Sequence, residues 1–158
     1  MSRNYLLAMY DKALKWPFGQ RIFAHLFASK APYFKTIKPL ITELRPNYCE
    51  LTFAKRKAVH NHIGTVHAIA LCNGLEMAMG ALAEASIPSH LRWIPKGMTV
   101  RYTAKADSDI RIVAQTPEDS WREGDVDVAV AGYRADGTAV IEGHITIYVS
   151  KKPERKKS

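Results

Sequence analysis

A carboxylate on an apolar helix is the feature of this sequence that most invites a chemical role. The stretch 60–87 is apolar almost throughout, and after His67 its strongly polar side chains are Asn73, Glu76 and Glu84. A helix that is apolar on every face is normally buried, and Glu is seldom buried without a partner or a function. We therefore expect Glu76 either to act as a base or nucleophile or to be bonded to the backbone or to a lysine across a dimer.

One stripe of this helix carries its small and polar residues. The following project within an arc of about 80°, since successive helical residues are about 100° apart: Asn73, Glu76, Gly80 and Glu84. The opposite stripe carries mainly larger aliphatic side chains, at Leu71, Leu75, Ala78 and Leu82. We expect the first stripe to face a substrate channel or a closely packed second subunit.

Neither the cysteines nor the histidines indicate a metal or a disulfide. Cys49 and Cys72 are too few for a disulfide framework and lie in apolar stretches, so we expect buried thiols. His60, His62 and His67 could chelate a metal, but neither a cysteine nor a further carboxylate completes the ligand set nearby. We therefore expect no metal and no cofactor.

Length and composition indicate one globular domain. The chain has 158 residues, of which 47% are apolar and 24% charged. No apolar run approaches the roughly 18 residues of a membrane span, and Asp11, Lys12 and Lys15 interrupt the N-terminal apolar segment where a signal peptide would be continuous. We expect a cytoplasmic protein without a membrane span.

The net charge of +8 favours an anionic partner. No basic stripe interleaved with aromatic residues is present, so nucleic acid is not expected. Two amphipathic helices, 4–16 and 20–29, are expected to cover one edge or end of the core. A membrane-surface role through Lys12, Lys15 and Arg21 is the alternative, which the mixed charges do not favour.

The remaining elements predict an α+β architecture. Alternating residues indicate strands at 40–44, 49–53, 98–105, 110–116, 126–134 and 139–149, with the long helix between the second and the third. A single antiparallel sheet of about six strands needs its apolar face covered, so we expect it to wrap around the helix. Because that helix lacks a polar face, we also expect a homodimer.

This order of elements, together with the motif around the helix start, resembles the hotdog-fold thioesterase superfamily. It is most similar to the phenylacetate-pathway-type acyl-CoA thioesterases and their uncharacterised bacterial relatives. Those proteins have an Asn, a His six positions later that is followed by two glycines, and an Asp or Glu nine positions after the His. Asn61, His67 and Glu76 match this spacing.

The resemblance implies a single hotdog domain over residues 1–158. Its core spans 38–150, residues 1–30 form a helical addition, and 151–158 form a disordered basic tail. It also implies a dimer or tetramer whose sites combine the helix-start amide of one subunit with the carboxylate of another.

The resemblance further implies hydrolysis of an acyl-CoA thioester. The N–H of Ala68 at the positive helix start would stabilise the oxyanion, Glu76 would be the base or nucleophile, and Asn61 would hold the attacking water or the carbonyl. The residues expected to contact substrate, including the phosphates of coenzyme A, are His67, Ile69, Asn73, Arg101 and Lys105.

Two alternatives remain open on the sequence. Ala68 and Ile69 replace the two glycines of the family, and Pro95 replaces a Ser or Thr. These departures motivate a non-catalytic acyl-CoA-binding or lipid-binding hotdog protein. The other alternative is a hydratase or dehydratase, for which His67 is the candidate acid–base residue.

Overall fold

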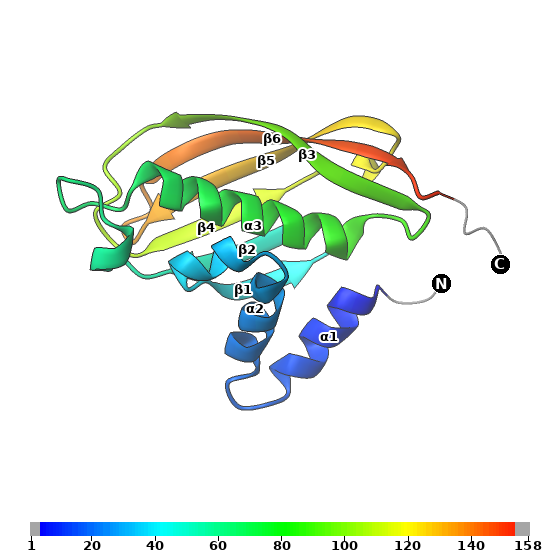
Figure 1. Ribbon diagram of the computed structural model, residues 1–158, viewed down its shortest axis with the longest axis horizontal. Helices are drawn as coiled ribbons and strands as arrows, with labels where there is room; N and C mark the ends of the chain where they lie inside the picture. The colour runs from blue at the N-terminus through cyan, green and yellow to red at the C-terminus, as the bar shows by residue number, and fades with distance from the viewer. Residues whose placement is uncertain (1–3, 154–158) are drawn as a thin grey trace.

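The computed structural model describes residues 4–153, in which a six-stranded antiparallel sheet curves around one long helix, α3 (Ala68–Ser86) (Figure 1). The strands in chain order are β1 (Leu40–Arg45), β2 (Tyr48–Phe53), β3 (Leu91–Tyr102), β4 (Ile110–Gln115), β5 (Gly124–Arg134) and β6 (Ala139–Lys151). Their order in space is β1-β2-β4-β5-β6-β3, and every neighbouring pair is antiparallel. The predicted α+β architecture is confirmed.

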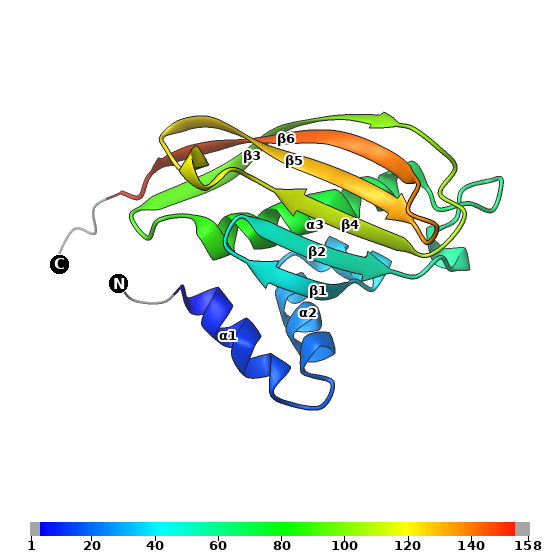
Figure 2. The ribbon, with the colours of Figure 1, turned by 180° about the vertical axis from the view of Figure 1, so that it is seen from behind.

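The two predicted N-terminal helices are present and form a hairpin. α1 (Tyr5–Leu14) is capped by Asn4, whose Oδ1 accepts backbone N–H groups of the first turn. α2 (Gly19–Lys30) follows, and the 3₁₀ turn η1 (Pro32–Ile37) leads into the sheet. Figures 1 and 2 show the hairpin projecting from the body beside β1.

The sheet buries one face because its apolar residues alternate with polar ones. On β4, Ile110, Ile112 and Ala114 are buried, whereas Arg111 and Gln115 are exposed. The aliphatic stripe of α3 enters the same core, with these residues buried: Leu71, Leu75, Ala78 and Leu82. The helix has the length and mean hydropathy of a membrane span, but 67% of that stretch is buried, as in the core helix of a soluble fold.

Within a single chain α3 is not buried on every face, and the expected cover from a second subunit stays a prediction. Glu76 and Glu84 are exposed, and Cys72 is half-buried. The sheet covers one side of the helix and the N-terminal helices approach another, so a strip between the two layers stays open to solvent. The carboxylates are therefore solvated in a single chain.

β3 also differs from its prediction, because it begins at Leu91 and its middle is exposed. Met98 and Val100 are only half-buried, and the register shifts between Pro95 and Gly97. Proline cannot donate a ladder hydrogen bond and is tolerated at sheet edges and bulges. The burial that alternation predicted is missing because β3 is an edge strand with β6 as its one neighbour.

One edge of the sheet is covered by other elements and the other edge is open. At β1, the Thr42 carbonyl accepts hydrogen bonds from the Tyr10 hydroxyl of α1 (3.1 Å) and the Gln20 amide of α2 (3.4 Å), so the N-terminal hairpin covers this edge. No described element covers the outer edge of β3. A long uncovered edge presents unpaired N–H and C=O groups to a further strand.

The predicted disordered tail is shorter than expected at its start. Lys151 is the last residue of β6, and Lys152 is fixed by bonds from its N–H to the His90 carbonyl (2.9 Å) and from its Nζ to the Ser89 carbonyl (2.8 Å). Residues 154–158 lie outside the described residues.

Candidate functional site

The loop before α3 is held by the side chain of Asn61. Its Oδ1 accepts the N–H groups of Ile63 and Thr65, each at 3.1 Å, and its Nδ2 donates to the Thr65 hydroxyl at 2.8 Å. The same loop pairs with the 3₁₀ turn η2 (Lys57–Val59), since the N–H of His67 donates to the Val59 carbonyl (2.8 Å). The Oδ1 of Asn61 thus serves the loop, while one N–H of its Nδ2 is left over. The predicted contact with water or a carbonyl stays a prediction.

Replacing Asn61 is therefore expected to loosen the loop. Asn61→Ala removes three hydrogen bonds from a partly buried turn and should lower the free energy of unfolding by about 1–3 kcal/mol. Asn61→Asp keeps both acceptor bonds and is the matched control. Urea unfolding measures both variants. Unchanged stability of Asn61→Ala together with lost catalysis would instead assign Asn61 a direct catalytic role.

The start of α3 leaves one first-turn amide occupied and others free. His67 is the N-cap, and its Nδ1 accepts the N–H of Ile69 at 3.0 Å. The N–H of Ile69 is therefore not a free donor, and the substrate contact expected of Ile69 would have to use its exposed side chain. No acceptor among residues 4–153 meets the N–H of Ala68 or of Ala70. Ala68, the first helical residue, keeps the free donor that the sequence predicts for it.

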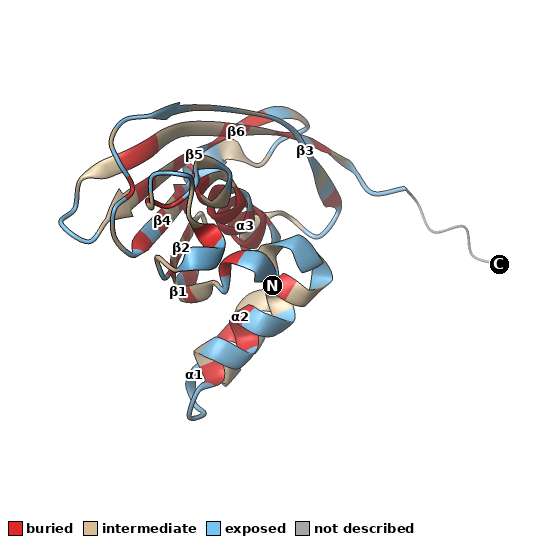
Figure 3. Cartoon of the chain, turned by 60° about the vertical axis from the view of Figure 1, so that its left-hand side comes forward, coloured by how far each residue is buried: buried red, intermediate tan, exposed pale blue. Residues whose placement is uncertain are grey.

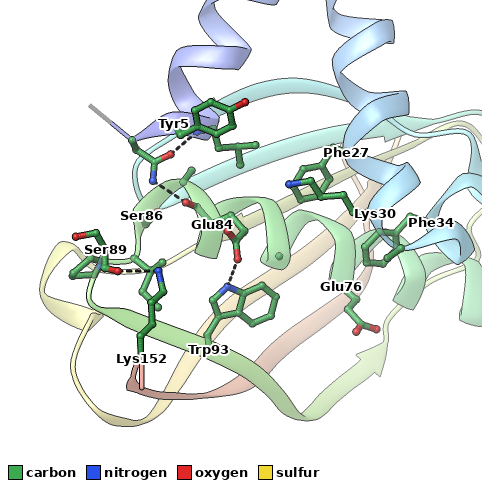
Figure 4. Close-up of a pocket in the computed structure, with 17 residues that line it drawn as sticks. Tyr5, Phe27, Lys30, Phe34, Glu76, Glu84, Ser86, Ser89, Trp93 and Lys152 are labelled. Carbon is green, nitrogen blue, oxygen red and sulfur yellow. Dashed lines mark hydrogen bonds between the residues drawn. The ribbon is translucent and has the colours of Figure 1, made fainter. Parts of the chain in front are cut away.

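Glu76 lies two turns further along α3, at the wall of a cavity of about 1080 Å³ (Figure 4). Within the described chain its carboxylate has no hydrogen-bond or ion-pair partner, and pairing with a lysine of a second subunit stays a prediction. Glu84 differs, because its Oε1 accepts the indole N–H of Trp93 at 2.8 Å. Of the two carboxylates in the cavity, Glu76 is the one available for chemistry.

The cavity is walled by elements far apart in the sequence. α1 and α2 contribute Tyr5 and Phe27, η1 contributes Phe34, and β3 contributes Trp93. Figure 4 shows Phe34 above Glu76 and Trp93 across the helix from the N-terminal hairpin. The sequence predicted that the hairpin covers an edge of the core but not that it walls a cavity. No periodicity in the chain marks this contact, since it depends on how the hairpin packs.

Cys72 lies one turn before Glu76 and interacts with the hydroxyl of Tyr102 on β3. Burial raises the pKa of the Cys72 thiol above its usual value, although the nearby Tyr102 hydroxyl acts in the opposite direction. A thiol with a raised pKa is protonated near pH 7 and is a poor nucleophile. The prediction that Cys49 is buried is correct, and its pKa is also raised by burial.

The predicted substrate contacts are not gathered in one place. Asn73 is buried beneath η1, where its Nδ2 donates to the Tyr33 carbonyl (3.2 Å) and the Thr36 hydroxyl (3.0 Å), so it does not face the cavity as expected. Its Oδ1 is buried without a partner in the described chain. At the end of β3, Arg101 is paired with Glu142 (3.0 Å) on the exposed surface.

Two further expected residues lie close to the helix start or beyond β3. His67 is exposed and, with Ile69, borders a smaller hollow of about 390 Å³ beside α3. Lys105 is exposed in the loop after β3. Among the described residues, no three His, Cys, Asp or Glu side chains gather in a way that could hold a metal, and this includes the three histidines of the loop.

Comparison with known proteins places the chain among proteins of this architecture. The model of DUF4442, a domain of unknown function, matches residues 19–149. No curated protein matches the sequence. The crystal structure of the structural-genomics protein APC5556 is 45% identical, covers 94% of this chain and 99% of its own, and has a TM-score of 0.83.

Two more distant structures carry thioesterase names. PA5026 from Pseudomonas aeruginosa, a protein of unknown function called a probable thioesterase, is 24% identical over 87% of this chain and 97% of its own, with a TM-score of 0.74. A thioesterase family protein from Silicibacter pomeroyi is 17% identical over 86% of this chain and 100% of its own, with a TM-score of 0.70. These likenesses identify the architecture as the hotdog fold.

Proposed function

We propose that this chain, which belongs to the DUF4442 family and has the hotdog fold of the thioesterases, hydrolyses an acyl-CoA thioester. The observation that carries the proposal is the unpaired Glu76 carboxylate at the wall of a large, mostly apolar cavity. A carboxylate beside an acyl-sized cavity can activate a water for attack on a carbonyl or attack it directly. The oxyanion that forms then needs a donor such as a helix-start N–H.

In the proposed site the two groups come from two subunits. Ala68 and Glu76 are eight residues apart on a straight helix, which separates them by about 12 Å. One thioester carbonyl cannot contact both at that distance. We therefore place the Ala68 N–H of the partner subunit opposite Glu76, as the resemblance to the acyl-CoA thioesterases implies.

The open edge of β3 supports this dimer. β1 is covered by the hairpin, whereas β3 offers a twelve-residue edge on which Ile94 and Tyr102 are largely exposed. Pairing of β3 with its copy would continue the sheet and satisfy that edge. It would also bring a second α3 alongside the exposed stripe that carries Glu76.

The distance along the chain between two residues of a relative also supports a catalytic role for Glu76. Two solved structures of one thioesterase from Staphylococcus aureus carry alanine in place of a glutamine and of a glutamate that lie fifteen positions apart. Asn61 and Glu76 have the same spacing and similar side chains. We accordingly keep Asn61 in the site as the residue that positions the loop bearing His67 and Ala68.

We place the acyl chain along α3, from Glu76 past Gly80 toward Glu84, a length of about 12 Å. The walls beside this path are apolar and aromatic, including Phe27, Phe34 and Trp93. Such walls favour a medium or long aliphatic chain over acetate. The phosphates of coenzyme A would lie at two exposed cations expected from the sequence, Arg101 and Lys105. The reaction would take place in the cytoplasm.

Gly80 should set the chain length that the cavity accepts. A Cβ at this position would lie 3.5 Å from Cη2 of Trp93, so a small side chain fits and a large one enters the acyl path. Gly80→Leu is expected to lower kcat/KM for dodecanoyl-CoA by at least about tenfold, with butanoyl-CoA changed far less. Gly80→Ala is the matched control. An equal loss on both substrates would contradict this path for the chain.

The proposed function is tested by release of free coenzyme A, measured with a thiol reagent, from a panel of acyl-CoAs of increasing chain length. Turnover of medium or long chains by the wild-type protein is the expected result. Retention of an acyl-CoA in native mass spectrometry without turnover would refute hydrolysis and favour the non-catalytic binding protein instead.

A further inference from the structure

The tip of the N-terminal hairpin exposes large apolar side chains that the candidate site does not use. We define the hairpin tip as Leu14, Trp16, Phe18 and Ile22. Trp16 and Phe18 are 68% and 74% exposed, and Figure 3 shows the hairpin extending away from the sheet. Leu14, Trp16 and Phe18 share a hollow of about 400 Å³, so they form one continuous face. Contiguous apolar surface of this kind marks an interaction site.

The turn that carries the tip is rigidly built. Gly19 packs so tightly on α1 that a Cβ there would lie 1.7 Å from the Ala13 carbonyl oxygen. The N–H of Trp16 donates to the Ala13 carbonyl and the N–H of Gly19 to the Trp16 carbonyl, each at 3.0 Å. Phe18 is held at φ 61°, a left-handed conformation that a bulky residue rarely adopts. The fold therefore fixes a strained backbone that directs an aromatic ring into water.

The surroundings of the tip are basic. Lys12, Lys15 and Arg21 are exposed beside it, and Arg21 lines the same hollow as Trp16. Residues 1–42 contain seven Lys or Arg and one acidic residue, Asp11. Most of the net charge of the protein therefore lies in the part of the chain that carries the tip.

We propose that the hairpin tip docks on an anionic phospholipid bilayer. An apolar tip containing Trp and Phe matches the boundary between headgroups and acyl chains, and flanking Lys and Arg match the phosphates of an anionic leaflet. A protein partner would need both an apolar socket and a ring of carboxylates, whereas a bilayer supplies both features everywhere. The long α3 stays in the core, so the contact is peripheral.

The same hairpin connects this surface with the cavity. Tyr5 and Leu6 of α1, and Phe27 and Lys30 of α2, line the cavity that contains Glu76. Docking by the tip would therefore fix one end of the hairpin at the lipid surface and leave the cavity wall at its other end. The inference itself rests on the exposed tip and its charges, and it stands whether or not the cavity hydrolyses thioesters.

The test is co-sedimentation of the full chain with vesicles of phosphatidylcholine alone and of phosphatidylcholine with about 30% phosphatidylglycerol. Binding to the anionic vesicles only, weakened by added salt, is the expected result. Trp16→Ser with Phe18→Asn should lower the partition coefficient at least about tenfold, and Asn tolerates the left-handed backbone at position 18. Lys12→Glu with Lys15→Glu should weaken binding comparably and leaves the turn intact.

The matched control is Ile63→Ser, which removes a similarly exposed apolar side chain (57%) far from the tip and should leave vesicle binding unchanged. Equal binding by the wild-type protein, the Trp16/Phe18 variant and the Lys12/Lys15 variant would overturn the proposal, as would a lack of binding to anionic vesicles. A tip variant that changes the oligomeric state in analytical ultracentrifugation, with no effect on vesicle binding, would assign the tip to a contact between copies of this chain instead.

Discussion

Glu76→Ala is expected to lower kcat for the best acyl-CoA substrate by about a hundredfold or more, the usual order for removal of a general base. The carboxylate is exposed, unpaired within the described chain and at the cavity wall, so its loss removes the group that activates water without disturbing a bond of the fold. KM should change little, because the acyl path along α3 is untouched. Single-turnover release of coenzyme A measures the chemical step.

Two further variants separate chemistry from structure. Glu76→Gln keeps the shape of the side chain without its charge and should be as inactive as Glu76→Ala. Glu43→Gln alters an exposed carboxylate on β1, outside the cavity, and should retain wild-type turnover. Wild-type rates in Glu76→Gln would remove Glu76 from the mechanism and, with it, the proposed function of the cavity.

Ala68→Pro is expected to lower kcat by about a hundredfold to a thousandfold, the range seen when one oxyanion donor is removed. Proline is accepted at the first position of a helix, and His67 already has the extended conformation (φ −64°, ψ 138°) that a residue before proline prefers. The substitution therefore deletes the free N–H of Ala68 while keeping α3. Circular dichroism and steady-state kinetics check the two halves of this expectation.

Ala68→Gly is the matched control, because it keeps the N–H and restores the residue that the resembling family has here; activity should be retained. Subunit exchange between Ala68→Pro and Glu76→Ala then tests the shared site. Each mixed dimer contains one intact N–H facing one intact carboxylate, so an equal mixture should recover about a quarter of wild-type turnover. Two inactive proteins that stay inactive after verified exchange would place both groups in one subunit.

The sequence by itself determined the architecture, because local patterns carry it. Alternation predicted all six strands, although it missed the first half of β3 from Leu91 to Gly97. The apolar run closed by Pro88 predicted α3, with Leu75 and Leu82 in the core. The spacing of Asn61, His67 and Glu76 predicted the hotdog fold. These signals survive in the sequence because period, turns and motif distances depend on neighbours along the chain.

Tertiary structure decided which of these groups are available. Asn61 and Asn73 looked free but are bonded to the loop and to η1, and Ile69 donates its N–H to His67. Glu76 looked buried but is exposed in a single chain, although Asn73 and Gly80 on the same stripe are buried. A hydrogen-bond partner far along the chain leaves no trace in local periodicity. The sequence therefore identified the candidate residues but not whether their polar groups are already hydrogen-bonded.

The role of the N-terminal hairpin was decided entirely by packing. Tyr5, Phe27 and Phe34 wall the cavity, whereas Trp16 and Phe18 project from the far end into solvent. Both sets have the same apolar character in the sequence, and helical spacing assigned Tyr5, Trp16 and Phe27 alike to a cover for the core. Which aromatic residues meet α3 and which meet water depends on the crossing of α1 and α2 at Gly19, where the absence of a Cβ permits the two backbones to touch.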